Sequence, residues 1–312
     1  MRTDHVMIII GSLSLLSSCA TEDQSARSGA SEALSAPTPA EPASGGGMIA
    51  FTSERDGEAD IYVMDADGSD LTRLTDDPAY DAWPTWSPGG SQIAFMSTRN
   101  GRADIYVMDA DGGNLRQLTH HSAGDIWPEW SPDGTRIAFP SRRDDNFEIY
   151  VVNPDGSGLK RLTDSPDTED FPAWSPDGSQ IVFSRCEGDL GTYIMKADGT
   201  ATRKVTDLVA MEPAWSPDGE RIAFASDHEG FRGLYVMDAD GANLKRLSTT
   251  RAGENCPAWS PDGTRIAFAS WRDGDGEVYL MDADGGNLRK LTDNDVEDEF
   301  PAWRPAPGPG AR

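Results

Sequence analysis

The sequence predicts an all-β protein, a six-bladed β-propeller with four-stranded blades. Three observations support this fold class. A Trp-x-Pro motif recurs at intervals of 44, 44, 41, 44 and 44 residues. Four short apolar segments fall within each repeat, and a period in the low forties with four such segments is typical of propeller blades. Residues 48–303 show no sustained helical period. The six motifs begin at Trp86, Trp130, Trp174, Trp215, Trp259 and Trp303.

Each repeat predicts four strands, here called A to D. Strand A ends at the Trp, and Ile-Ala-Phe, Ile-Tyr-Val-Met and Leu-x-Arg-Leu-Thr form strands B, C and D. Ser-Pro-Asp-Gly between A and B is a type I turn, because Pro presets φ at the second position and Gly accepts a left-handed backbone at the fourth. Asp-Ala-Asp-Gly links C to D as a tight turn. The β-branched and aromatic residues of B and C suit a sheet packed on both faces.

The two ends of the propeller are predicted to meet in one blade. Strand B at residues 49–51 has no strand A before it, and strand A at residues 298–303 has no strand B after it. Six complete blades therefore require residues 298–303 to complete the first blade, residues 48–75. This closure leaves no open sheet edge between the first and last blades.

An apolar run at residues 6–16 has the length of a signal peptide and is too short to span a bilayer. It ends in Leu16-Ser17-Ser18-Cys19, which resembles a bacterial lipobox. The resemblance implies that residues 1–18 are removed and that Cys19 carries lipid. Because Ala20 rather than Asp follows, it also implies sorting to the outer membrane. We expect a lipid-anchored protein on the periplasmic or cell-surface side of the envelope.

The remaining segments are predicted from composition. Residues 19–47 are rich in Ser, Ala, Glu, Pro and Gly, which predicts a flexible tether. The propeller then spans residues 48–305, and residues 306–312 form a short tail. The net charge of −26 argues against nucleic acid as a partner and against electrostatic docking on anionic lipid. We expect a monomer that contacts the membrane through its lipid alone and meets cations or partners with a basic segment.

A ring of acidic residues is the strongest candidate site. Strand A of a propeller blade lines the central channel, so acids five residues before each Trp would encircle one mouth of it. Such a ring would favour a cation such as calcium, or a basic segment of a partner. The alternative is that Arg residues of the B–C loops pair with acidic neighbours and form repeat-to-repeat ion pairs that serve the fold. The acids are Asp81, Asp125, Glu169, Glu254 and Asp298, with Ala210 in the fifth blade, and the loop residues are Arg55, Arg99, Arg143 and Arg272.

Aromatic residues follow the acids by two positions, so alternation predicts them on the same side of strand A. We interpret them as contacts between blades: Trp83, Trp127, Phe171 and Phe300, with Cys256 as a small buried residue in the same position. Trp271 lies in a B–C loop and is expected to be exposed and to contact a partner. The B–C and D–A loops vary between repeats, so specificity is expected on their face.

No catalytic residue is predicted. The four His residues lack zinc-binding spacing, and no Gly-x-Ser-x-Gly motif is present. Asp-Ala-Asp-Gly lacks the further ligands of a calcium loop.

The repeats Trp-Ser-Pro-Asp-Gly, Ile-Ala-Phe and Ile-Tyr-Val-Met-Asp-Ala-Asp-Gly resemble the TolB-type WD40-like propeller repeat over residues 48–305. The resemblance implies a bacterial envelope protein that binds partner proteins, although only the tether stands where TolB has its N-terminal domain. We therefore expect a non-enzymatic scaffold for a protein or peptide. The alternatives are a calcium-dependent, lactonase-like propeller hydrolase and a glycan-binding module.

Overall fold

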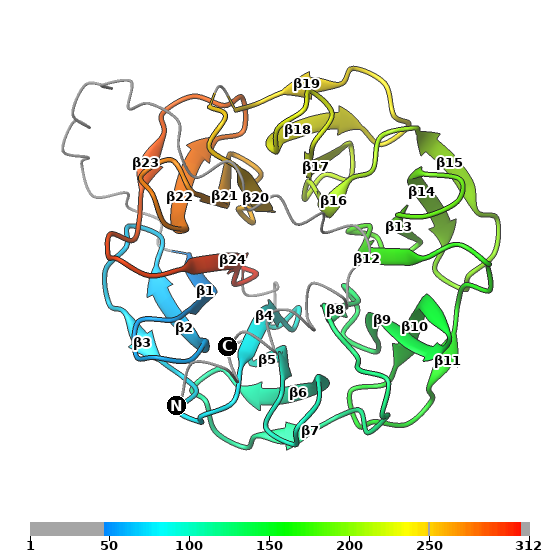
Figure 1. Cartoon of the computed structure of the whole chain (residues 1–312), viewed down its shortest axis with the longest axis horizontal. Helices are drawn as coiled ribbons and strands as arrows, with labels where there is room; N and C mark the ends of the chain where they lie inside the picture. The colour runs from blue at the N-terminus through cyan, green and yellow to red at the C-terminus, as the bar shows by residue number, and fades with distance from the viewer. Residues whose placement is uncertain (1–46, 249, 307–312) are drawn as a thin grey trace.

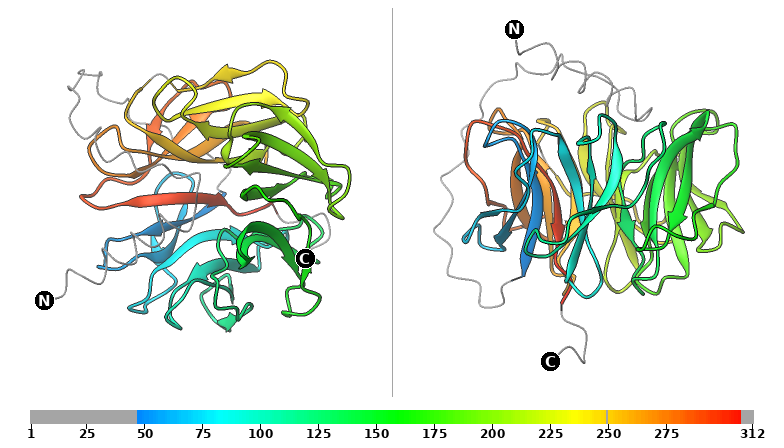
Figure 2. Two further views of the ribbon diagram at one scale, coloured as in Figure 1. Left: turned by 45° about the vertical axis from the view of Figure 1, so that its right-hand side comes forward. Right: turned by 90° about the horizontal axis from the view of Figure 1, so that it is seen from below.

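The computed structural model describes residues 47–248 and 250–306 and shows a six-bladed β-propeller (Figure 1). Each blade is a four-stranded antiparallel sheet with strand A innermost and strand D outermost. The strands run across the thickness of a disc (Figure 2). The predicted signal peptide, Cys19 and nearly all of the tether and tail lie outside the described residues. Within those residues, no helix is long and apolar enough to cross a membrane.

The blades are numbered 1 to 6 by their strands B. Strands A are β24 (Asp298–Trp303), β4 (Asp81–Trp86), β8 (Glu129–Trp130), β12 (Glu169–Trp174), β16 (Met211–Trp215) and β20 (Glu254–Trp259). Strands B are β1 (Met48–Ser53), β5 (Gln92–Ser97), β9 (Ile137–Asp144), β13 (Gln180–Arg185), β17 (Arg221–Ser226) and β21 (Arg265–Ser270). Strands C are β2 (Asp60–Asp65), β6 (Asp104–Asp109), β10 (Asn146–Val152), β14 (Gly191–Lys196), β18 (Gly233–Asp238) and β22 (Glu277–Asp282). Strands D are β3 (Thr72–Arg73), β7 (Arg116–Gln117), β11 (Lys160–Arg161), β15 (Arg203–Thr206), β19 (Lys245–Arg246) and β23 (Arg289–Lys290).

The ring closes as the sequence predicts. Strand β24 pairs antiparallel with β1, and Ile49 lies opposite Trp303 (Figure 1). The backbone N–H of Arg304 also donates to the carbonyl oxygen of Met48 over 2.7 Å. The first and last segments of the propeller therefore share blade 1, and neither leaves an unpaired edge inside the ring.

Neighbouring blades are joined at the inner strands by the recurring Trp. In five blades its indole N–H donates to a carbonyl oxygen of strand A in the preceding blade, over 3.1 to 3.3 Å. The five bonds run from Trp86 to Ala302, Trp174 to Glu129, Trp215 to Ala173, Trp259 to Ala214 and Trp303 to Ala258. Trp130 in blade 3 is the exception, because its buried indole N–H has no partner in the described structure.

The outer strands are joined by the C–D turns. Gly68 has φ +88°, and a Cβ there would lie 2.7 Å from the carbonyl oxygen of Leu291 in the preceding blade. Gly112 meets the carbonyl of Leu74 in the same way at 2.8 Å. The Gly of each turn is therefore needed for its left-handed backbone and for the close approach of two blades.

We predict that Trp303→Ala lowers the free energy of unfolding by about 3 to 5 kcal/mol. Trp303 is 7% exposed, and the change removes its packing between blades 1 and 6 together with its bond to Ala258. Urea denaturation measures the effect. Leu288→Ala, at a side chain that is 41% exposed, is the control and should change stability little. Equal stability of the two variants would contradict the importance of closure.

Candidate functional site

The five predicted ring acids are completely buried, and each one is paired with an Arg of its own blade. Their exposed fraction is 0% in every case. The ion pairs are Arg55–Asp298 at 2.7 Å, Arg99–Asp81, Arg143–Asp125 and Arg185–Glu169 at 2.8 Å, and Arg272–Glu254 at 2.5 Å. Each pair joins strand A to the region where strand B meets the B–C loop, so it stabilises one blade rather than linking two repeats.

Arg185 was not predicted as a partner, because it follows Ser184 directly, whereas the other four Arg residues stand two positions after their Ser. Blade 5 has Ala210 in place of the acid, and its B–C loop has Asp227 and His228 after Ser226. The acid and its Arg are thus lost together, which indicates that they function as a structural pair.

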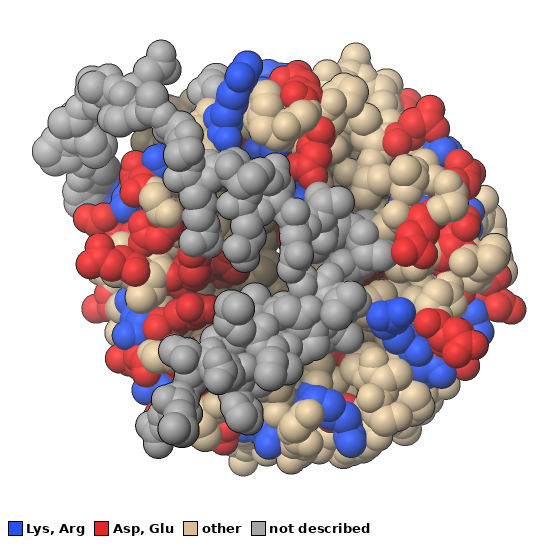
Figure 3. Space-filling model, in the orientation of Figure 1, with Lys and Arg blue, Asp and Glu red and all other residues tan. Residues whose placement is uncertain are grey.

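A binding role for the ring acids gains no support from their burial, because a partner at the surface cannot reach side chains that are 0% exposed. Within the described residues, no group of three or more His, Cys, Asp and Glu is placed to hold a metal ion. Calcium binding by this ring therefore stays an untested prediction. Around the visible rim in Figure 3, Asp and Glu are interspersed with Lys and Arg.

Trp271 is half-buried rather than exposed as expected. Its indole N–H donates to Glu297 Oε2 over 2.8 Å, and the same oxygen accepts from the backbone N–H of Gly276. These bonds join the B–C loop of blade 6 to the D–A loop that leads into strand β24 of blade 1. Trp271 therefore has a structural role in this arrangement.

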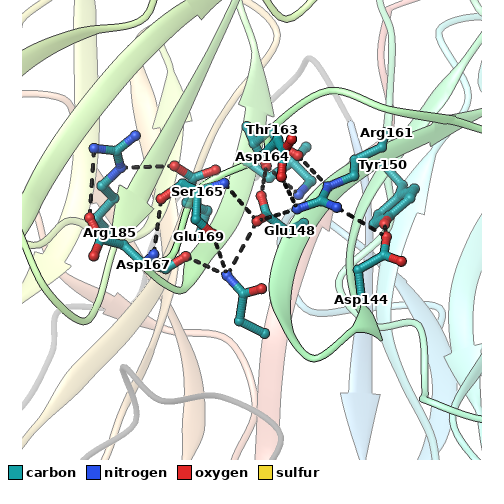
Figure 4. Close-up of polar contacts among 12 residues, drawn as sticks. Asp144, Glu148, Tyr150, Arg161, Thr163, Asp164, Ser165, Asp167, Glu169 and Arg185 are labelled. Carbon is teal, nitrogen blue, oxygen red and sulfur yellow. Dashed lines mark hydrogen bonds and ion pairs between the residues drawn. The ribbon is translucent and has the colours of Figure 1, made fainter.

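A second set of buried carboxylates stands at the start of strands C and was not singled out from the sequence. Figure 4 shows one example, in which Glu148 accepts from Arg161 at 2.7 Å and from Thr163 and Ser165. The neighbouring Glu169–Arg185 pair of blade 4 lies beside it. Burial raises the pKa of Glu169, and the nearby Glu148 carboxylate adds to the rise. The members are Asp60, Asp104, Glu148 and Glu277, all 0% exposed.

This second set could have been found from the repeat. An acid two residues before the Tyr of strand C and a basic or amide residue before Leu-Thr recur together in blades 1, 2, 3 and 6. At the junction of blades 4 and 5, Gly191 and Ala210 stand at the positions of the two carboxylates. The Ala210 N–H donates to the hydroxyl oxygen of Thr192, the residue after Gly191, over 3.0 Å. A hydrogen bond between neutral groups therefore stands where other blades have buried carboxylates and their partners.

A cavity of about 570 Å³ occupies the centre of the ring. All six blades line it with the second half of strand A and with the Pro two residues after the recurring Trp. The cavity therefore lies on the side of the A–B turns, whereas binding was expected on the face of the D–A and B–C loops. None of the ring acids lines it.

Six residues at equivalent positions of strands A have a left-handed backbone. Their φ values range from 43° to 59°, and each stands directly before a Pro. Positive φ is costly for bulky side chains, and Pro in a strand is tolerated at an edge or bulge. Strand A is the inner edge, and its pairing with strand B shifts register here, for example between Ala82 and Thr85. The six are Trp83, Trp127, Phe171, Glu212, Cys256 and Phe300.

This bulge makes the expected alternation wrong. The acids two positions earlier enter the blade and pair with Arg, while the six left-handed residues line the cavity. Four of them form a continuous aromatic arc, and each contacts its neighbour in the next blade as predicted. The ring centroids are 5.8 Å apart for Phe300 and Trp83, 4.7 Å for Trp83 and Trp127, and 4.4 Å for Trp127 and Phe171.

The other third of the ring is polar. Glu212 Oε2 accepts from the backbone N–H of Cys256 over 2.9 Å. Burial raises the pKa of the Glu212 carboxyl and, strongly, that of the Cys256 thiol. Cys256 is buried, as the sequence suggested. A thiol with a raised pKa is a poor nucleophile, so Cys256 is suited to packing rather than to chemistry.

Glu129 is a further cavity residue that was missed from the sequence. It replaces the Ala or Thr that stands before the Trp in the other repeats. Its Oε2 accepts from the Thr85 hydroxyl over 3.0 Å, and burial raises its pKa to about 7. Strand β8 around it has two residues, whereas the other strands A have five or six. The inner wall of blade 3 is thus less regular than the others.

A closed ring of six four-stranded antiparallel blades defines this protein as a β-propeller. A family model described as the TolB β-propeller domain matches residues 15–185, 125–208, 171–257 and 206–308. The chain therefore belongs to the TolB β-propeller domain family.

Solved structures agree with this fold. TolB from Acinetobacter baumannii has a TM-score of 0.72 and 24% identity over 83% of this chain and 67% of that one. A putative TolB from Agrobacterium tumefaciens has a TM-score of 0.64 and 22% identity over 83% and 97%. A chain of a nidogen–laminin complex has a TM-score of 0.67 at 11% identity, over 83% and 98%. At these identities the likeness shows the fold alone. No curated protein matches the sequence.

We predict that Arg143→Met lowers the free energy of unfolding by about 3 to 5 kcal/mol, because it leaves Asp125 buried without its cation. Adding Asp125→Asn should restore part of the loss, and a double-mutant cycle in urea measures the coupling. Arg203→Met, at an exposed position, is the control. If Arg143→Met is as stable as this control, the pair does not stabilise the blade.

Proposed function

We propose that this protein is a non-enzymatic scaffold that binds a peptide or protein segment in its central cavity. The observation that carries the proposal is the cavity itself, which is lined by the aromatic arc of blades 1 to 4 and by the carboxylates of Glu129 in blade 3 and Glu212 in blade 5. Its volume of about 570 Å³ falls within the range of ligand sites, which are mostly apolar with a few placed polar groups. Aromatic side chains also dominate binding energy at protein interfaces.

The rigidity of the frame supports this function. The cavity wall consists of six inner strands that are fixed by backbone pairing and by the Trp bonds between blades. A preformed wall loses little conformational entropy when a ligand binds. We prefer binding to the lactonase-like alternative because each of the five ring acids, which were the candidate calcium ligands, is already paired with an Arg.

We place this scaffold at the bacterial envelope. The support is the apolar run before Cys19, its lipobox-like ending, and membership of the TolB propeller family. Fractionation of cells that express Cys19→Ser tests the anchor. The variant should move from the membrane fraction to the soluble fraction, and an unchanged distribution would contradict lipid anchoring.

We predict that a partner crosslinks from the A–B turn face. A photoreactive phenylalanine replaces Pro217, which is exposed and lines the cavity, and in a second variant it replaces His228, which is exposed in a B–C loop. Crosslinking in envelope preparations should capture a partner from position 217. Trp127→Ala should reduce this capture while thermal melts verify folding. Capture from position 228 alone would place binding on the opposite face and contradict the proposal.

A further inference from the structure

The described residues that line the cavity carry acidic groups and no basic groups. Among the described residues that line it, the only ionisable side chains are Glu129, Glu212 and Cys256, and none is Lys, Arg or His. This differs from the buried acids elsewhere, such as Asp81 and Asp125, which have an Arg within 2.8 Å.

The bonds that the two cavity carboxylates make come from neutral groups. Glu129 Oε2 accepts from the Thr85 hydroxyl, and Glu212 Oε2 accepts from the Cys256 backbone. The charge of Arg232 partly offsets the rise in the pKa of Glu212. However, Arg232 is paired with Asp227 at 3.1 Å and does not line the cavity. Burial raises the pKa of both carboxyls, which means that their charged forms lack full compensation. A cation that entered the cavity would compensate the negative charges of both carboxylates.

The aromatic arc can bind the same cation. Arg and Lys are attracted to the face of an indole ring within about 6 Å, and the effect grows when the pair is desolvated. The protein already uses this contact around the cavity, since the guanidinium of Arg136 lies 4.6 Å from the Trp174 ring and that of Arg304 lies 5.2 Å from the Trp86 ring. In the arc itself, Trp83 and Trp127 have no such cation in the described structure.

We propose that the cavity binds a peptide segment that carries a Lys or Arg side chain, with the cation between Glu129, Glu212 and the aromatic arc. This inference rests on the proposed function and adds the chemical class of the ligand. Glu129 is then the residue that determines specificity, because no other blade has an acid at its position.

The test compares two pools of short peptides on immobilised full-length protein. In one pool the central residue is Lys, in the other it is norleucine, and the flanking residues are randomised. The Lys pool should be retained roughly tenfold or more above the norleucine pool on the wild type. Glu129→Gln and Glu212→Gln should each remove most of this preference.

Glu220→Gln is the matched control. Glu220 is exposed in an A–B turn and does not line the cavity, so this variant makes the same charge change on the same face. The net charge of −26 attracts any basic peptide, and such general attraction would survive in all three variants. A Lys preference that is equal in wild type, Glu129→Gln and Glu220→Gln would therefore overturn the inference.

The pH dependence gives a second readout. With a pKa of about 7, Glu129 becomes charged between pH 6 and pH 8. Glu212 and Cys256 are the only other ionisable groups among the described residues that line the cavity. The Lys preference should rise over this range in the wild type and stay flat in Glu129→Gln. Equal retention of both pools would refute the charge preference and leave the cavity as a binding site. Retention of neither pool would also refute it, while crosslinking from position 217 tests the proposed function independently.

Discussion

The contact on which the ring depends is the hydrogen bond from the indole of one blade to the inner strand of the blade before it. A four-stranded blade has an apolar face on each side and is not stable alone, so every blade must pack on two others. The Trp provides this packing at the centre of the ring, where the blades converge. Its N–H also fixes the position of each inner strand relative to the inner strand of the preceding blade. The last Trp, Trp303, makes the same bond to Ala258 and thereby joins the end of the chain to blade 6.

The pre-proline residue of strand A separates the structural part of the ring from the part that faces the cavity. A regular strand would place residues 81 and 83 on one side. The left-handed backbone at Trp83, together with the register shift beside it, instead allows Asp81 to enter the blade and Trp83 to line the cavity. A bulge of this kind is found at strand edges and near functional sites, and its strain is balanced here by the surrounding sheet. The same device recurs in all six blades.

The sequence predicted the fold almost completely, because a propeller is specified by local repeats. The period, the turn residues and the unmatched strands at the two ends were sufficient to predict six blades and their closure. The site was harder to predict, because it depends on a backbone irregularity. The Pro after Trp83 and its five counterparts was a visible sign of a bulge, yet a two-residue alternation cannot represent one. Glu129 was missed for a different reason: the comparison of repeats followed the acids five positions before the Trp and not the position next to it.

The departures from the repeat are informative because the repeats are otherwise so similar. Six identical blades would give a cavity with sixfold symmetry, which could not hold an asymmetric ligand in one orientation. In this protein the aromatic arc covers blades 1 to 4, Glu212 and Cys256 occupy blades 5 and 6, and Glu129 stands in blade 3. The orphan indole of Trp130 and the short strand β8 fall in that same blade. Among the described residues, blade 3 therefore concentrates a buried donor without an acceptor, an acid without a cation beside it and an interrupted strand. The first two are costly in a protein interior, so the departures of blade 3 from the repeat are not explained by the stability of the ring.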